Sequence, residues 1–199
     1  MQPEVGLFEA IYTARSIRAL KPDPVPDELV RRILEAACQA PSGSNSQPWR
    51  FVVIRSPEGK RQLDKLVFQA EQLRAGGQGV SAVRQSLADV PVIVLVCADR
   101  AKSSWPPSVV GIFGQTFPAV QNLLLAARAF GLGGNMTTSY RWMEAEIKAH
   151  LGVPDDMDTV VLVPLGYPDE SRGARHGKKT RLPLNAVAYE ERWGESLKF

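Results

Sequence analysis

The 199-residue chain has little of what metal and nucleophile chemistry needs, with two cysteines and two histidines. His150 and His176 lie far apart, and neither Cys38 nor Cys97 belongs to a CxxC pair, so no zinc or other metal site is expected. Each cysteine stands in an apolar stretch, which predicts buried free thiols and fits a reducing compartment. No Ser-His-Asp or Cys-His set is recognisable with so few histidines.

Long apolar runs and dense basic blocks are also absent. The 24 basic and 21 acidic residues leave a net charge of +3, and no basic block is interleaved with aromatic residues, so nucleic acid is not an expected partner. No apolar run is long enough to cross a membrane, and the first residues do not resemble a signal peptide. The expectation is therefore a cytoplasmic protein with no membrane partner.

Helices and strands are both predicted within one domain covering residues 1–199, with an irregular arm from about residue 167. The segment 91–97 is apolar throughout, which predicts a central strand buried on both faces. The segment 117–130 is the most apolar helical one and is the predicted core helix. The other expected helices are 5–14, one from 27–28 that Pro41 stops, one after a Ser56 cap, and 144–151; the other expected strands are 51–54 and 159–166.

The order of these elements indicates the fold class. Helices and strands mix without a regular βα alternation, which favours an α+β or mixed sandwich over a doubly wound nucleotide-binding fold. No G-x-G-x-x-G motif follows a strand and opens a helix. No paired carboxylates stand in a cleft-like context either, so an enzyme built from this chain would take its chemistry from a cofactor.

Two segments supply cations for an anionic ligand. Arg15, Ser16 and Arg18 follow a helix and could hold a phosphate through charge-assisted bonds, or could be a solvated helix end. Lys179 and Arg181 flank a hydroxyl and also suit a phosphate, or could belong to a charged tail.

Two further segments are rich in small residues. The loop 41–49 has small and amide side chains between a helix and a strand, which suits a flat ligand with polar edges; the alternative is a connector whose amides bond the local backbone. The glycines at 133–134 would let backbone approach such a ligand, or could form a tight turn and a short strand.

Five segments in chain order resemble the FMN-dependent nitroreductase family, and together they span nearly the whole chain. One segment alone is a weak indication, but five in order identify the chain as similar to this family. The segments are RSIRAL at 15–20, APSGSNSQPWRF at 40–51, GLGGNMT at 131–137, PLGYP at 164–168 and KTRLP at 179–183.

The resemblance implies an α-β-α sandwich around a mainly antiparallel sheet, in an intertwined homodimer with FMN at the subunit interface. NADH or NADPH would reduce the flavin and leave, and a small-molecule acceptor such as a nitroaromatic or a quinone would take its place. No side chain is expected as an essential acid or base, although Arg18 would stabilise charge on the reduced ring. The residues implied to bind FMN are Arg15, Ser16, Arg18, Met136, Thr137, Lys179 and Arg181 of one chain, and Pro41, Ser42, Gly43 and Asn45 of its partner.

Some features of the chain depart from the family pattern or leave its substrate open. Ala14 stands where the family commonly has a second basic residue, so one phosphate contact is expected to be missing. Trp105 and Phe113 are candidates for the pocket wall over the flavin, with ordinary packing as the alternative. Other flavin chemistry, namely dehalogenation, enone reduction or flavin breakdown, stays open, and so does a flavin-binding protein with little turnover.

Overall fold

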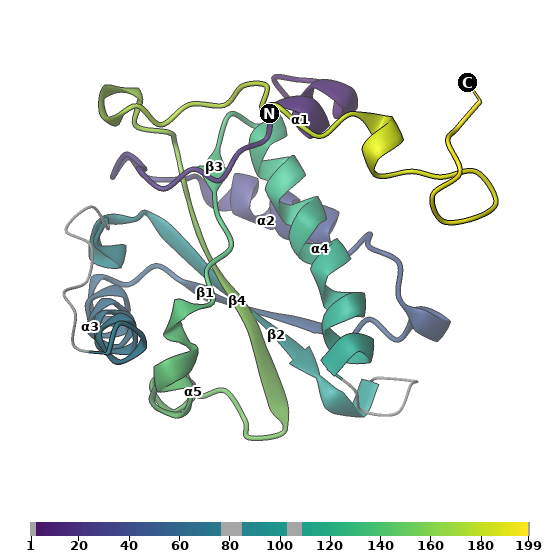
Figure 1. Ribbon diagram of the computed structural model, residues 1–199. Helices are drawn as coiled ribbons and strands as arrows, with labels where there is room; N and C mark the ends of the chain where they lie inside the picture. The colour runs from purple at the N-terminus through teal and green to yellow at the C-terminus, as the bar shows by residue number, and fades with distance from the viewer. Residues whose placement is uncertain (1–2, 77–84, 103–108, 199) are drawn as a thin grey trace.

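A four-stranded antiparallel sheet forms the middle layer of the computed structural model, which describes residues 3–76, 85–102 and 109–198 (Figure 1). The strand order is β1-β2-β4-β3, with β1 at Trp49–Ile54, β2 at Val92–Asp99, β3 at Gly133–Gly134 and β4 at Met157–Gly166. β2 pairs along its length with β1 and β4, and a register shift falls between Val96 and Cys97. The predicted α+β sandwich is confirmed.

Helices cover both faces of this sheet. Every residue of β2 is buried, and its side chains alternate between two apolar cores, as a strand between two helical layers requires. One core lies under α2 (Asp27–Ala37) and α4 (Val109–Ala129), and the other under α3 (Pro57–Arg74) and α5 (Glu144–Leu151) (Figure 1).

The helix caps expected from the sequence are present. Ser56 Oγ accepts a hydrogen bond from Gly59 N at 3.1 Å and caps α3, with Pro57 as the first helical residue. Gly131 and Gly152 follow α4 and α5 with φ of 73° and 65°, a backbone conformation that favours glycine.

The core helix is longer than the sequence predicts. α4 begins at Val109, eight residues before the expected start at 117, and Pro118 lies inside it. A proline inside a helix removes one backbone hydrogen bond and is a common reason to place a helix start there. Ile112, Ala119 and Val120 are all buried, so packing of the apolar face outweighs the proline penalty.

The first helix, α1 (Leu7–Thr13), does not bury the face that its pattern indicates. Ala10 is its one buried residue, and the apolar side chains that share one face of the helix are exposed. Helical spacing shows that apolar residues share a face, but it does not say which surface covers that face. The four exposed side chains are Leu7, Phe8, Ile11 and Tyr12.

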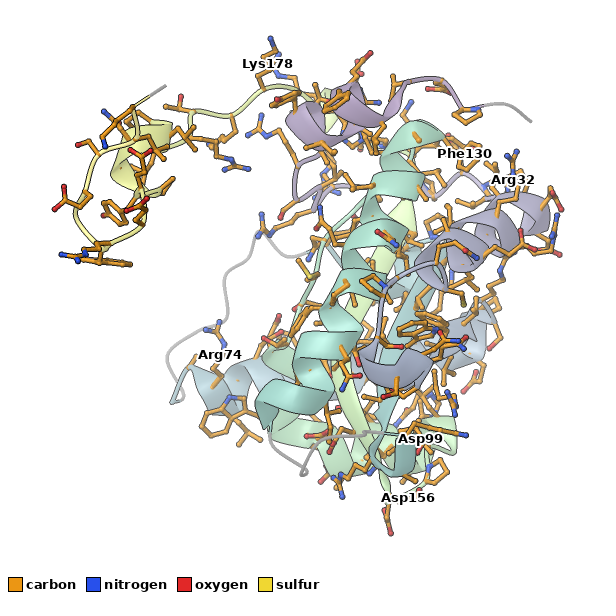
Figure 2. All side chains as sticks on the ribbon, turned by 90° about the vertical axis from the view of Figure 1, so that its right-hand side faces the viewer. Arg32, Arg74, Asp99, Phe130, Asp156 and Lys178 are labelled. Carbon is orange, nitrogen blue, oxygen red and sulfur yellow. The ribbon has the colours of Figure 1, made fainter. Side chains whose placement is uncertain are left out.

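The C-terminal arm leaves the sheet after β4 and crosses the end of α1. Gly177 N donates to Thr13 O at 3.0 Å, and beyond this point the chain runs away from the body (Figures 1 and 2). Several apolar side chains of the arm are exposed, among them Trp193 at 90%. Within the described ranges, no helix is both long and apolar enough to cross a bilayer.

The two cysteines differ in environment. Cys97 on β2 is buried as predicted, and burial raises the pKa of its thiol to about 11. Cys38 is exposed, so the prediction that it is buried was wrong; it lies just after the last turn of α2, past the residues that face the sheet.

Replacing Cys38 with Ser should leave no thiol that reacts in the native protein, because Cys97 is both buried and protonated near neutral pH. A thiol reagent should detect no reactive group at pH 7.5 and one per chain after denaturation. Rapid labelling of the native variant would contradict the described packing of β2.

Candidate functional site

A cavity of about 400 Å³ gathers cations from three distant parts of the chain. We call it the cationic cavity. Five basic side chains line it, Arg15, Arg18, Arg128, Lys179 and Arg181, and no acidic side chain of the described residues does. The remaining lining residues are Ile11, Ala14, Ser16, Gln121, Leu124, Leu132, Gly133, Gly134, Met136 and His176.

The segment after α1 is held extended against the sheet by its buried residue. Ile17 packs in the core, and its N–H donates to Gly134 O at 2.9 Å. Because neighbouring side chains of extended backbone point to opposite sides, burying Ile17 turns Ser16 and Arg18 away from the core. Both of these candidates line the cationic cavity, and so does Ala14, where a second basic residue was expected to be missing.

The two glycines of β3 allow its backbone to pack closely against neighbouring segments. A Cβ at Gly133 would lie 2.6 Å from Ile17 Cγ1, and one at Gly134 would lie 2.6 Å from Pro164 O. The short strand of the alternative interpretation is present, and the glycines let segment 16–17 and β4 approach β3. Both glycines also line the cationic cavity, so close approach of a ligand to their backbone stays a prediction.

The continuation of β3 separates the cationic cavity from a second one of about 310 Å³, which we call the adjoining cavity. Gly134 and Met136 line the first, whereas Asn135 and Thr137 line the second, as the alternation of extended backbone requires. Arg18 lines both, so one guanidinium stands where the two cavities meet.

Polar side chains from outside the sequence motifs line the adjoining cavity, among apolar ones. Gln85 exchanges two hydrogen bonds of 2.7 Å with the backbone of Leu20, which ties the segment before β2 to the segment after α1. Glu71 of α3 accepts from Ser139 Oγ at 3.1 Å, and Ser139 Oγ lies 3.2 Å from Thr137 Oγ1. A carboxylate thus lies near the site although no motif segment contains one.

The arm carries the last two predicted cations to the cationic cavity. His176 Nε2 lies 3.0 Å from Leu132 O, and the backbone bond from Gly177 to Thr13 holds the next residue. Lys179 and Arg181 follow directly and line the cavity. They meet Arg15 and Arg18 although more than 160 positions separate the two groups.

Arg128 and His176 are titratable residues of the cavity lining that were not predicted from the sequence. Arg128 is the only charged residue of α4, an isolated charge in a 21-residue apolar helix, and this was the available signal. Burial of His176 lowers the pKa of its imidazole, and the nearby Arg128 charge lowers it further. Its Nδ1 is buried and has no hydrogen-bond partner among the described residues.

The small-residue loop does not reach either cavity of its own chain. Gly43 N donates to Gln115 Oε1 at 2.8 Å, and Asp99 N donates to Pro48 O at 2.8 Å. Asp99 lies at the opposite end of the molecule from Lys178 (Figure 2). None of Pro41, Ser42, Gly43 and Asn45 lines the cationic or the adjoining cavity.

The loop nevertheless has an unusual backbone. Ser44, Asn45 and Gln47 have φ of 51°, 53° and 47°, a region that residues other than glycine adopt uncommonly. Ser42 Oγ accepts from Gln47 N at 3.0 Å and helps to hold this conformation. Strained backbone held by specific bonds is common in segments that contact ligands.

The two candidates for the pocket wall stay predictions. Trp105 lies outside the described residues. Phe113 packs on α4 with its ring centroid 6.4 Å from that of Phe117 and 5.2 Å from the guanidinium carbon of Arg141. It lines neither of the two cavities. No cluster of three His, Cys, Asp or Glu that could hold a metal ion occurs in the part of the chain that the structure describes.

A model of the Nitroreductase family matches residues 11–167, from within α1 to the end of β4. The chain belongs to the nitroreductase family. This match confirms the resemblance found in the sequence and, with it, the prediction of an oxidoreductase. The match stops where the arm begins, so Lys179 and Arg181 lie outside it.

Named relatives extend the comparison. The chain is 34% identical to the NADH dehydrogenase of Thermus thermophilus over 93% of this chain and 96% of the relative. It is 28% identical to iodotyrosine deiodinase 1 of Rattus norvegicus over 90% of this chain and 67% of the relative. Among solved structures, a nitroreductase of Desulfovibrio desulfuricans in complex with FMN superimposes with a TM-score of 0.72 at 29% identity, covering 96% of this chain and 99% of that one.

Proposed function

We propose that this nitroreductase-family protein binds FMN and uses NADH or NADPH to reduce nitroaromatics, quinones or similar small acceptors. The observation that supports this most is the cationic cavity, in which five basic side chains meet without an acidic one. Such a site favours a multiply charged anion, and a phosphate monoester carries a charge of about −1.5 to −2 near neutral pH.

The residues present fit FMN in their chemistry. Arg15, Lys179 and Arg181 would hold the phosphate, and Ser16 would offer a hydroxyl beside it. Arg18 lines both cavities and would place its charge near the ring rather than the phosphate. Met136 lines the cationic cavity and Thr137 lines the adjoining cavity. The flavin ring would lie beside the segment that carries these two residues. When bound, FMN supplies the hydride chemistry that no side chain offers.

Changing Arg181 to Ala should weaken FMN binding by roughly 1.5–3 kcal/mol, a factor of about 10 to 150, because one charge-assisted bond is lost. Quenching of flavin fluorescence measures the dissociation constant. Arg172→Ala is the matched control, because this arginine of the arm lines neither cavity and should leave binding unchanged. Equal FMN affinity in the two variants would contradict the placement of the phosphate.

We further propose that the protein is a homodimer. The exposed apolar face of α1 and the exposed apolar side chains of the arm, including Leu182, Leu184 and Val187, need a covering surface that one chain does not provide. The loop 41–49 lines neither cavity of its own chain, so a second copy would let it reach FMN from across an interface. The expected cytoplasmic location stays a prediction.

Light scattering at low micromolar concentration should give twice the 21.8 kDa mass of one chain. Placing a charge in the proposed interface through Leu184→Asp should shift the protein toward one-chain mass and loosen bound FMN, because buried apolar side chains anchor interfaces. A wild-type protein that carries flavin and has the mass of one chain would refute the dimer.

Changing Arg18 to Ala should slow flavin reduction by NAD(P)H roughly ten- to hundredfold even when FMN occupancy is complete, because a cation near the ring stabilises negative charge that develops there. Stopped-flow absorbance of fully loaded protein measures this rate, and Arg18→Lys should recover part of it. Glu71→Gln changes the other charged side chain among the described residues that line the adjoining cavity, and it should keep both flavin and turnover. Turnover lost in that variant with flavin retained would mean that a side chain acts as acid or base.

A second candidate activity rests on the similarity to the rat iodotyrosine deiodinase 1. Reductive dehalogenation would use the same flavin with a halogenated aromatic as acceptor. Parallel assays of NAD(P)H oxidation with a quinone, a nitroaromatic and an iodinated tyrosine would separate the two, and no turnover with any of them would favour a flavin-binding protein.

A further inference from the structure

Arg128 differs from the other four basic residues of the cationic cavity in its burial. Arg15, Arg18, Lys179 and Arg181 are exposed, whereas the side chain of Arg128 is 12% exposed. An ionic interaction is stronger where water is excluded, so a phosphate that reaches Arg128 would gain more from it than from an exposed cation.

The guanidinium of Arg128 is fixed along one edge. Its Nε donates to Thr13 Oγ1 at 2.9 Å, and its Nη2 lies 3.5 Å from Glu9 Oε1. Thr13 Oγ1 in turn donates to Glu9 O at 2.6 Å, so the hydroxyl that anchors Arg128 is itself held at the end of α1. The described bonds use Nε and Nη2, which leaves Nη1 for a ligand.

The charge of Arg128 is poorly neutralised within its own chain. Thr13 is neutral, and the ion-pair partner among the described residues, the carboxylate of Glu9, lies 3.5 Å away and is 57% exposed, so that pair is weak. One exposed carboxylate at this distance compensates only part of the cost of burying the charge of Arg128. The charge of Arg128 also acts on His176 in the same cavity, where it adds to the effect of burial in lowering the pKa of the imidazole. The cavity therefore carries an excess of positive charge, which a bound anion would compensate.

Resting on the FMN site proposed above, we infer that Arg128 binds the phosphate directly and is the residue that makes this chain select a phosphorylated flavin over riboflavin. The exposed cations attract the anion and hold its outer oxygens. Arg128 meets it at the buried end of the cavity, where an unphosphorylated ligand would leave the guanidinium with the exposed carboxylate of Glu9 as its nearest described counter-charge.

Binding of FMN and of riboflavin to Arg128→Gln tests this inference. FMN should bind roughly ten- to a hundredfold more weakly than to the wild type, while riboflavin should change less than threefold or bind slightly better. Arg128→Lys keeps the charge but not the planar, bidentate N–H donors of the guanidinium. Its FMN affinity should therefore lie between those of the wild type and Arg128→Gln. The matched control is Arg100→Gln, which removes an arginine in an ion pair with Asp158 away from both cavities and should change neither affinity.

The outcomes separate this inference from the proposed function. A wild-type protein that does not bind FMN would defeat the proposed function itself. A wild type that binds FMN, with equal losses for FMN and riboflavin in Arg128→Gln, would overturn the inference, because Arg128 would then only support the fold. Should Arg128→Gln not fold, Arg128→Lys decides, and unchanged FMN affinity there with unchanged preference over riboflavin would also overturn it.

Discussion

The site depends on one close backbone contact, in which β3 lies directly against the segment that follows α1. This approach needs glycine at 133, because a Cβ there would lie 2.6 Å from Ile17 Cγ1, and the pairing of β3 with β4 needs glycine at 134, because a Cβ there would lie 2.6 Å from Pro164 O. The contact fixes Ile17 in the core and so turns Ser16 and Arg18 outward. It also fixes the alternation of residues 134–137, which divides the site into a cationic and an adjoining cavity.

The charge of the cationic cavity determines which kind of ligand it favours. Cations from the segment after α1, from α4 and from the arm meet in one cavity, and nothing acidic among the described lining residues neutralises them. Attraction to an anion is the simplest reason for tolerating such repulsion. The adjoining cavity has a different character, with amides, a carboxylate and apolar walls, which suits a flat ring with polar edges.

Much of the fold could be predicted from the sequence because its signals are local. The all-apolar run of β2, the Ser56 cap and the glycines after α4 and α5 each act within a few residues. The start of α4 could not be predicted in this way, because packing of Ile112 and its neighbours overrides the local effect of Pro118. The pattern of α1 identified an apolar face but not that one chain leaves it exposed. Arg128 and Glu71 were missed because only tertiary packing brings α4 and α3 to the motif segments.

We propose that the cationic cavity holds one FMN per chain. The most direct measurement is to denature the purified protein, separate the released flavin by chromatography and identify it by mass, with the chain concentration determined in parallel. We expect FMN at close to one per chain, either as isolated or after incubation with FMN and removal of the excess. Protein that neither carries nor takes up FMN, or that retains FAD or riboflavin in its place, would contradict it.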